Sequence, residues 1–192
     1  MKDESSGQDG VEEGLLQATL AAARRDGQTS LPSGAPTRRL THGVVIRDLP
    51  TFADERGSVT ELYDLRWNFH PDPLVFAHTF TIRPGFVKGW GLHKKHEDRY
   101  AIFSGEMALV LFDPRPNSPT CGEVCRIILS EHRRQLVNVP RFVWHADHNI
   151  GTTDVLVVSF PTMAYDHADP DKYRLPLDTD LIPYSFGSAL GG

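Results

Sequence analysis

The sequence of 192 residues has little cysteine, a small net charge and no long apolar run. Its two cysteines, Cys121 and Cys125, are separated by three residues, a spacing that matches neither a CxxC redox pair nor a four-ligand zinc site. No apolar stretch approaches the roughly 18–20 residues of a membrane span, and the N-terminal residues MKDESSGQDG lack the features of a secretory signal. The net charge of −5, without a run dense in Lys and Arg, argues against binding to nucleic acid. We therefore expect a soluble cytoplasmic protein with reduced thiols.

A polar N-terminal region precedes a long block of short apolar segments. Residues 1–40 are rich in Gly, Ser and Pro, and we interpret them as a tail with a short helix at 11–25, where apolar residues have helical spacing. Residues 41–192 are expected to form a single domain. Within it, strand-like segments separated by turn residues lie at 44–49, 58–65, 74–82, 99–105, 106–113, 124–130, 135–139 and 154–160. This pattern predicts an all-β, antiparallel sandwich or barrel, with the Pro-rich segment from Lys172 onward extended along its surface.

Two segments, 84–105 and 140–149, carry most of the reactive side chains. Their ordered residues are Gly85, Gly91, His93, Asp98 and Gly105 in the first, and Pro140, His145 and Asn149 in the second. This order and spacing resemble the two cupin motifs, with Gly91 in the place of the first motif's first histidine. The resemblance implies a cupin double-stranded β-helix, or jelly roll, with extended N- and C-terminal segments.

A closer resemblance, over residues 43–186, is to the nucleotide-sugar cupins of the dTDP-4-dehydrorhamnose 3,5-epimerase family. The segments that carry it are 54–57, 91–93, 104–106, 113–115, 118–122, 129–131 and 165–170. The resemblance implies a cytoplasmic, homodimeric isomerase of deoxysugar biosynthesis that needs no cofactor. Its substrate would be a 4-keto-6-deoxyhexose linked to a nucleoside diphosphate, from which a proton next to the ketone is removed.

Epimerisation next to a ketone requires a base, a group that holds the enolate charge and an acid. The resemblance assigns the base to His93 and places His145 in the same cavity; an imidazole with a pKa near 6.5 suits proton transfer at neutral pH. The chain lacks the family's tyrosine at 154–160, so Tyr100 or Tyr165 would supply the acid. By the same resemblance, the C-terminal segment that supplies the family's aspartate partner of the base is missing, so His93 would lack its usual orienting carboxylate.

Further residues are candidates for contacts with the substrate. By the resemblance, Arg56 and Glu61 would contact the nucleotide or sugar from a neighbouring subunit; the alternative is an ion pair in a hairpin turn. Trp90 and Trp144 would stack on a base or sugar, unless they pack at the barrel rim. Trp90 and Asp98 stand where the family carries Arg and Lys, so Lys88, Lys94, Lys95 and Arg99 are the candidates to replace the missing positive charge.

A different interpretation starts from Asp98, which restores the acidic ligand of metal-binding cupins. With His93 and His145 it would form a site of two histidines and one carboxylate for Fe, Mn or Zn, in a metal-dependent oxygenase or isomerase. We expect His96 at the surface, because strand alternation would turn it away from His93. For the same reason either Asp147 or His148 is expected to face solvent or to bind Asn149 locally. A third interpretation is a non-catalytic relative that binds a sugar nucleotide.

Overall fold

The computed structural model describes residues 6–34, 37 and 39–192. The chain divides into two units, Met1–Arg39 and Leu40–Gly192. In the first unit, α1 spans Ser6–Ala22, so it begins and ends earlier than the predicted 11–25. Its apolar residues Leu15, Leu16 and Leu20 are 54–66% exposed. No helix among the described residues is long and apolar enough to cross a membrane.

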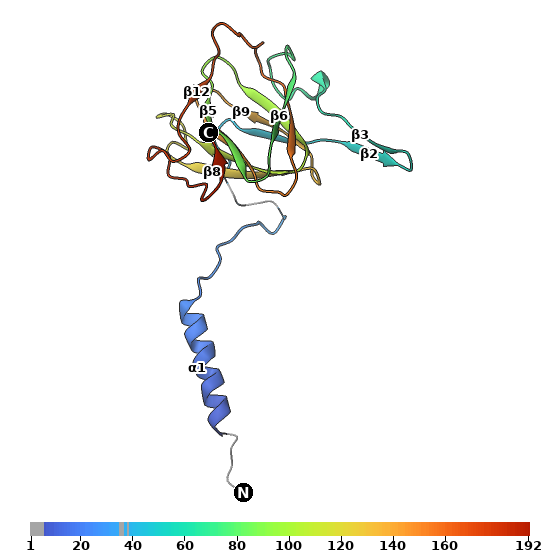
Figure 1. Ribbon diagram of the computed structural model, residues 1–192. Coiled ribbons are helices and arrows are strands. Elements are labelled where there is room, and N and C mark those ends of the chain that lie inside the picture. The colour runs from blue at the N-terminus through green and yellow to red at the C-terminus, as the bar shows by residue number, and fades with distance from the viewer. Residues whose placement is uncertain (1–5, 35–36, 38) are drawn as a thin grey trace. The chain divides into compact units, whose positions relative to one another are not determined.

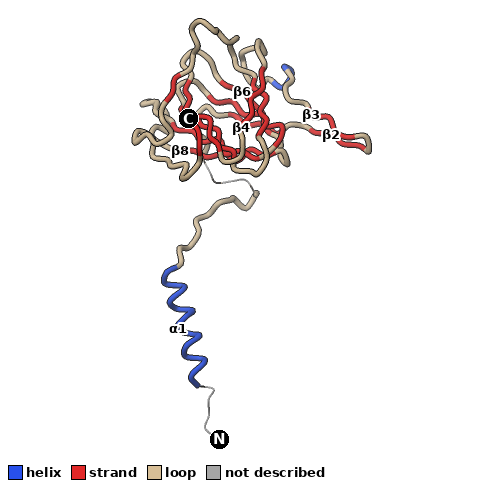
Figure 2. Tube along the Cα trace, viewed as in Figure 1, coloured by secondary structure: helices blue, strands red, loops and turns tan. Residues whose placement is uncertain are grey.

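The second unit consists of two β-sheets and a hairpin, with antiparallel neighbours almost throughout (Figures 1 and 2). One sheet has the order β1 (Val45–Asp48), β9 (Gln135–Val139), β6 (Asp98–Ser104), β11 (Val155–Ser159) and β4 (His78–Ile82). The other has the order β12 (Tyr173–Arg174), β5 (Phe86–Leu92), β10 (Trp144–Asn149), β7 (Glu106–Phe112) and β8 (Val124–Ser130), and β13 (Leu190–Gly191) pairs with β5 in parallel. The predicted all-β jelly roll is confirmed.

The main core lies where alternate residues of the two sheets meet. On β7, Met107, Leu109 and Leu111 belong to this core, while Val110 between them belongs to a second cluster on the opposite face. All four side chains are 0% exposed. A strand that is covered on both faces explains why the segment EMALVLF is apolar almost without alternation.

Irregular segments cover the outer faces of both sheets. On the first sheet, Ala101 and Leu136 point away from the main core and pack beneath the segment 61–73, which includes the short 3₁₀ helix η1 (Leu65–Trp67). On the second sheet, the C-terminal segment packs Ile182, Tyr184 and Phe186 over the strands. The predicted surface extension at the C-terminus is therefore confirmed. The hairpin β2 (Thr51–Asp54) and β3 (Gly57–Thr60) projects from the body of this unit (Figure 1).

Candidate active site

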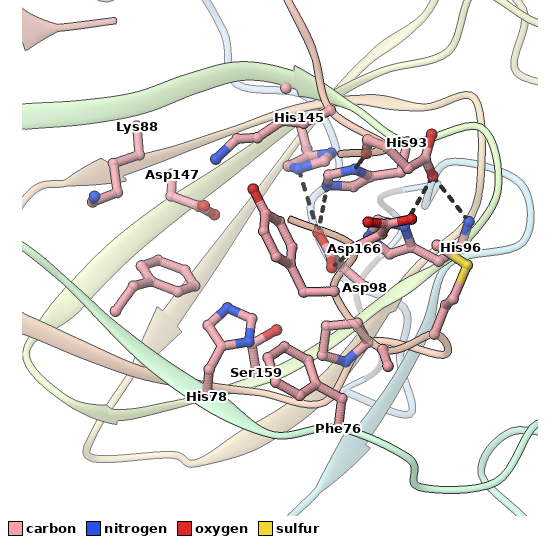
Figure 3. Close-up of a pocket in the computed structure, with 18 of the residues that line it drawn as sticks. Phe76, His78, Lys88, His93, His96, Asp98, His145, Asp147, Ser159 and Asp166 are labelled. Atoms are coloured by element: carbon pink, nitrogen blue, oxygen red, sulfur yellow. Dashed lines mark hydrogen bonds and ion pairs between the residues drawn. The ribbon is translucent and has the colours of Figure 1, made fainter. Parts of the chain in front are cut away.

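A cavity of about 200 Å³ is lined by strands of both sheets (Figure 3). His78 and Asp98 come from the first sheet, and Lys88 and His145 from the second. Two further stretches close it, residues 161–166 after β11 and residues 171–174 around β12. The cavity thus gathers side chains from segments that are far apart in the sequence, as a jelly roll does between its sheets.

His93 and His145 lie on one wall of this cavity, as the motif spacing predicts. Their ring centroids are 5.2 Å apart. Both rings direct Nε2 at the carboxylate of Asp98, at 3.1 Å from His93 and 3.6 Å from His145, measured to Oδ2. His93 follows the end of β5, His145 lies on β10 and Asp98 begins β6, so the three residues meet where these strands converge.

His96 belongs to the same cluster, which corrects the prediction that it lies at the surface. Residues 93–97 form the connection between β5 and β6 rather than a strand, so strand alternation does not apply to them. His96 is 9% exposed, and its ring centroid is 4.1 Å from that of His93. Its Nε2 lies 3.7 Å from Oδ1 of Asp98.

Asp171, from the C-terminal segment, holds this connection in place. Its carboxylate accepts hydrogen bonds from the backbone N–H groups of Lys94 and Lys95, at 3.0 and 2.7 Å, and from Nδ1 of His96 at 2.9 Å. Its main-chain carbonyl accepts a hydrogen bond from Nδ1 of His93. An aspartate from the C-terminal segment therefore does contact His93, which the sequence did not lead us to expect, but it does so through its main-chain carbonyl and not through an orienting carboxylate.

Burial and charge act in opposite directions on this cluster. Burial alone would raise the pKa of Asp98, but hydrogen bonds with His93 and His96 and the charge of His145 hold it well below its usual value. Burial would lower the pKa of His93, and the neighbouring Asp98 outweighs it, so that this pKa is raised. At His145 burial prevails over Asp98 and lowers the pKa to about 4. The cluster therefore favours positive charge at His93 and a neutral ring at His145.

Residues 39–179 match the model of the dTDP-4-dehydrorhamnose 3,5-epimerase family. The chain belongs to this family of nucleotide-sugar epimerases. It is 34% identical over 153 residues to the probable low-salt glycan biosynthesis epimerase Agl13 of Haloferax volcanii, covering 79% of this chain and 97% of the relative. It is 28% identical over 148 residues to the spore coat polysaccharide biosynthesis protein SpsL of Bacillus subtilis, covering 76% and 96%.

Solved structures show the same fold. The dTDP sugar isomerase of Desulfovibrio desulfuricans superposes with a TM-score of 0.72 at 25% identity, over 78% of this chain and 94% of that one. A mutant of the 3'-monoepimerase ChmJ of Streptomyces bikiniensis, solved in complex with dTDP, superposes with a TM-score of 0.69 at 21% identity, over 81% of both chains. The family resemblance predicts a tyrosine and a cation at the cavity, and the cavity of this epimerase is lined by both residue types.

Tyr100 and Asp147 form a buried pair beside the epimerase's histidine cluster. Asp147 lines the cavity, is 6% exposed, and its Oδ1 accepts a hydrogen bond of 2.9 Å from the Tyr100 hydroxyl. Burial raises the pKa of Asp147 to about 7, and it raises the pKa of Tyr100 well above its usual value. Asp147 was not among the predicted site residues. Because residues two apart on a strand share a face, it points the same way as His145. Of the pair Asp147 and His148, for which solvent exposure was expected, Asp147 is buried and His148 is half-buried.

Tyr165 and one of the four predicted cations line the cavity. Tyr165 lines it and is 47% exposed. Of the predicted cations only Lys88 lines the cavity; Lys172 and Arg174, which the sequence analysis did not select, line it as well. The other three predicted cations are engaged elsewhere: Lys94 lies over the ring of Tyr173, Lys95 pairs with Asp169, and Arg99 binds main-chain carbonyls.

The two predicted aromatic contacts lie outside this cavity. Trp90 is 0% exposed and packs against Tyr184 and Phe186, with ring centroids 6.3 and 5.3 Å away. On β5, Gly91 points into the cavity and the neighbouring Trp90 points to the opposite face of the sheet. In place of the predicted contact with substrate, Trp90 therefore has a packing role. Trp144 points to the same side as Trp90 and lines a separate open groove with Phe142.

Arg56 and Glu61 lie at the projecting hairpin. Arg56 forms an exposed ion pair of 2.5 Å with Asp54, the alternative that the sequence analysis considered. Glu61 is exposed just after β3. Neither residue lines the cavity of its own chain. A contact with substrate from a neighbouring subunit stays a prediction.

Proposed function

We propose that the protein epimerises a carbon next to the ketone of a 4-keto-6-deoxyhexose linked to a nucleoside diphosphate. The observation that carries this proposal is the cavity, which is lined together by a histidine and carboxylate cluster, a second buried carboxylate and three cationic side chains. Its volume of about 200 Å³ is below the roughly 300–1,000 Å³ of most ligand pockets. We therefore place only the sugar inside, with the nucleotide extending through the opening.

The geometry of the cavity favours a different general base from the one that the family resemblance implies. The resemblance assigns the base to His93, but Nδ1 of this ring is engaged by the Asp171 carbonyl and Nε2 faces Asp98 at 3.1 Å. Neither nitrogen of His93 is directed at open space. Asp147 instead presents a carboxylate to the cavity, held in place by Tyr100. We propose that Asp147 removes the proton and that His93 and His145 act in the wall that holds the enolate.

Positive charge near the ketone oxygen would stabilise the enolate. Lys88, Lys172 and Arg174 line the cavity and offset the carboxylate at the position where the family has a lysine. Tyr165 also lines the cavity, and we propose that its hydroxyl returns a proton to the sugar. These steps need no redox cofactor. We further propose that the enzyme acts in the cytoplasm as a homodimer, as the sequence predicts.

Deuterium exchange tests the proposal directly. The protein is incubated with dTDP-4-keto-6-deoxyglucose in deuterated water, and loss of the C3 and C5 proton signals is followed by NMR. We expect exchange in the native protein and a fall of roughly 10²–10⁴-fold in Asp147→Asn, the usual contribution of a general base. Asp154→Asn, at an exposed carboxylate outside the cavity, is the matched control.

Two results would contradict this assignment. If the native protein shows no exchange above background, the proposed epimerisation is refuted, and the interpretation left from the sequence is a non-catalytic relative that binds a sugar nucleotide. If Asp147→Asn exchanges at the native rate while His93→Asn does not, the base is His93, as the family resemblance implies.

A further inference from the structure

Three imidazole rings face the Asp98 carboxylate through the same ring atom (Figure 3). Nε2 of His93 and Nε2 of His145 lie 3.1 and 3.6 Å from Oδ2, and Nε2 of His96 lies 3.7 Å from Oδ1. Among the described residues, these rings are the ion-pair partners of Asp98. What can bind between the three imidazoles and the carboxylate depends on which nitrogen of each ring carries the N–H hydrogen.

The other nitrogen of each ring faces an oxygen that can only accept. Nδ1 of His93 binds the main-chain carbonyl of Asp171, and Nδ1 of His145 lies 3.3 Å from the carbonyl of Val143. Nδ1 of His96 lies 2.9 Å from the Asp171 carboxylate, which also accepts backbone N–H groups and is therefore an acceptor there. The hydrogen must accordingly sit on Nδ1 in all three rings. A neutral imidazole has one N–H, so in its neutral form each of these rings presents a lone pair at Nε2.

With all three rings neutral, the Nε2 lone pairs and the Asp98 carboxylate repel one another, and a cation between them relieves this repulsion. A proton on one ring satisfies only that ring's contact with Asp98. Protons on both His93 and His96 would place two positive charges in rings whose centroids are 4.1 Å apart in a buried site. One divalent ion would satisfy the contacts together, and it would leave every Nδ1 hydrogen bond intact.

We propose that His93, His96 and Asp98 bind a divalent transition-metal ion, with His145 beside it. Their ligand atoms all lie within 4.8 Å of one another. Metal bonds of about 2.0–2.2 Å to nitrogen and oxygen bring tetrahedral ligands to about 3.3 Å apart, close to the observed 3.1 and 3.7 Å. Two imidazoles and a carboxylate suit Zn(II), Fe(II) or Mn(II). Metal-binding histidines typically donate their second N–H to a carbonyl or carboxylate, as these rings do.

The structure thereby changes the ligand set considered from the sequence, because His96 takes the place that Gly91 leaves empty in the cupin motif. It also deepens the proposed function. On that function, a metal ion at this wall would act as a Lewis acid on the ketone oxygen and supply positive charge where the family uses a lysine. Binding of the ion itself does not depend on the reaction and is measured without substrate.

Metal content is the test. The full chain is purified without a metal-affinity step, stripped with a chelator and dialysed against Zn(II), and bound metal is measured by elemental analysis and titration calorimetry. We expect one Zn(II) per chain, and Co(II) in its place should give a visible d–d spectrum. His96→Gln should weaken binding by more than the roughly 10–100-fold that loss of an outer partner costs. Asp171→Asn, which removes such an outer partner of His96, should fall within that range.

His78→Gln is the matched control, because His78 lines the same cavity from β4 and lies outside the cluster; it should keep native affinity. Asp98→Asn is the second variant if His96→Gln fails to fold, and near-ultraviolet circular dichroism monitors folding. Absence of bound Zn(II) and Co(II) in the native protein, or native affinity in a folded cluster variant, overturns the site. A metal-binding protein without deuterium exchange would instead refute the proposed reaction and keep the site.

Discussion

Arg99 is a fully buried cation for which the described residues provide no carboxylate partner, and its replacement makes a quantitative test of the fold around the cavity. The side chain is 0% exposed. Its guanidinium donates to the Tyr63 hydroxyl at 2.9 Å and to four main-chain carbonyls at 2.8–3.2 Å, those of Asp72, Pro73, Phe160 and Pro161. Arg99 thereby ties the segment 61–73 to the end of β11, where Pro161 lines the cavity.

Arg99→Met keeps much of the volume and removes every donor. Phe160 and Pro161 are buried, so their carbonyls would lose a partner without gaining water, at about 1–3 kcal/mol each. Asp72 and Pro73 are exposed and can bind water instead. Because methionine also removes a buried charge, we expect the lower part of the combined range, about 2–4 kcal/mol. With a urea m-value of about 2 kcal/mol/M, the midpoint should fall by about 1–2 M.

Urea unfolding followed by circular dichroism, at one protein concentration, measures this change. Arg133→Met is the control, because Arg133 pairs with Asp48 at 72% and 61% side-chain exposure and should contribute little. Arg99→Lys keeps the charge but has three donors in place of five, so it should fall between the native protein and Arg99→Met. An Arg99→Met protein with the native midpoint would show that these carbonyls find other partners, and the argument from buried acceptors would fail.

Three further predictions concern residues away from the cluster. Trp90→Ala should lower the free energy of unfolding by about 3–5 kcal/mol without changing the exchange rate per folded molecule; lost substrate affinity at native stability would restore the stacking role. Arg56→Ala should leave the melting temperature unchanged and raise KM for the nucleotide sugar. An unchanged KM would show that Arg56 does not contact the substrate and only forms its ion pair with Asp54. Burial alone would raise the pKa of Asp113, but hydrogen bonds from Arg115, Ser118 and Thr120 lower this pKa below 3.8. The stability that Asp113 contributes is therefore complete above about pH 5 and is lost as the pH falls through the lowered pKa. The unfolding free energies of the native protein and Asp113→Asn, measured as a function of pH, should therefore converge in acid.

The fold could be predicted because its strands are short apolar segments that turn residues separate from one another. The segments expected at 106–113 and 124–130 are β7 and β8, paired in register from Glu106 with Ser130 to Phe112 with Val124. The segment at 74–82 was only partly strand, since β4 begins at His78. Pairing order was beyond reach, because β5 and β10 are neighbours through contacts between residues more than fifty positions apart.

Within the site, alternation explains both the successes and the errors. It places His145 and Asp147 on one face of β10 and Trp144 on the other. Applied to Trp90 and Gly91 on β5, it would have removed Trp90 from the cavity. Applied to His96 it failed, because the rule holds only for residues on a strand and His96 lies after β5 has ended.

Asp171 shows why the sequence could not reveal the ligand set. It lies on a segment without regular structure, 73 residues beyond Asp98, and no periodicity marks it. Yet one residue orients two rings, His93 through its carbonyl and His96 through its carboxylate, and so turns both Nε2 atoms toward Asp98. The direction of a ring is set by what binds its far nitrogen, and here that partner comes from the C-terminal segment. The chemistry of the cluster therefore depends on how that segment docks, which is a tertiary property that the two cupin-like segments do not contain.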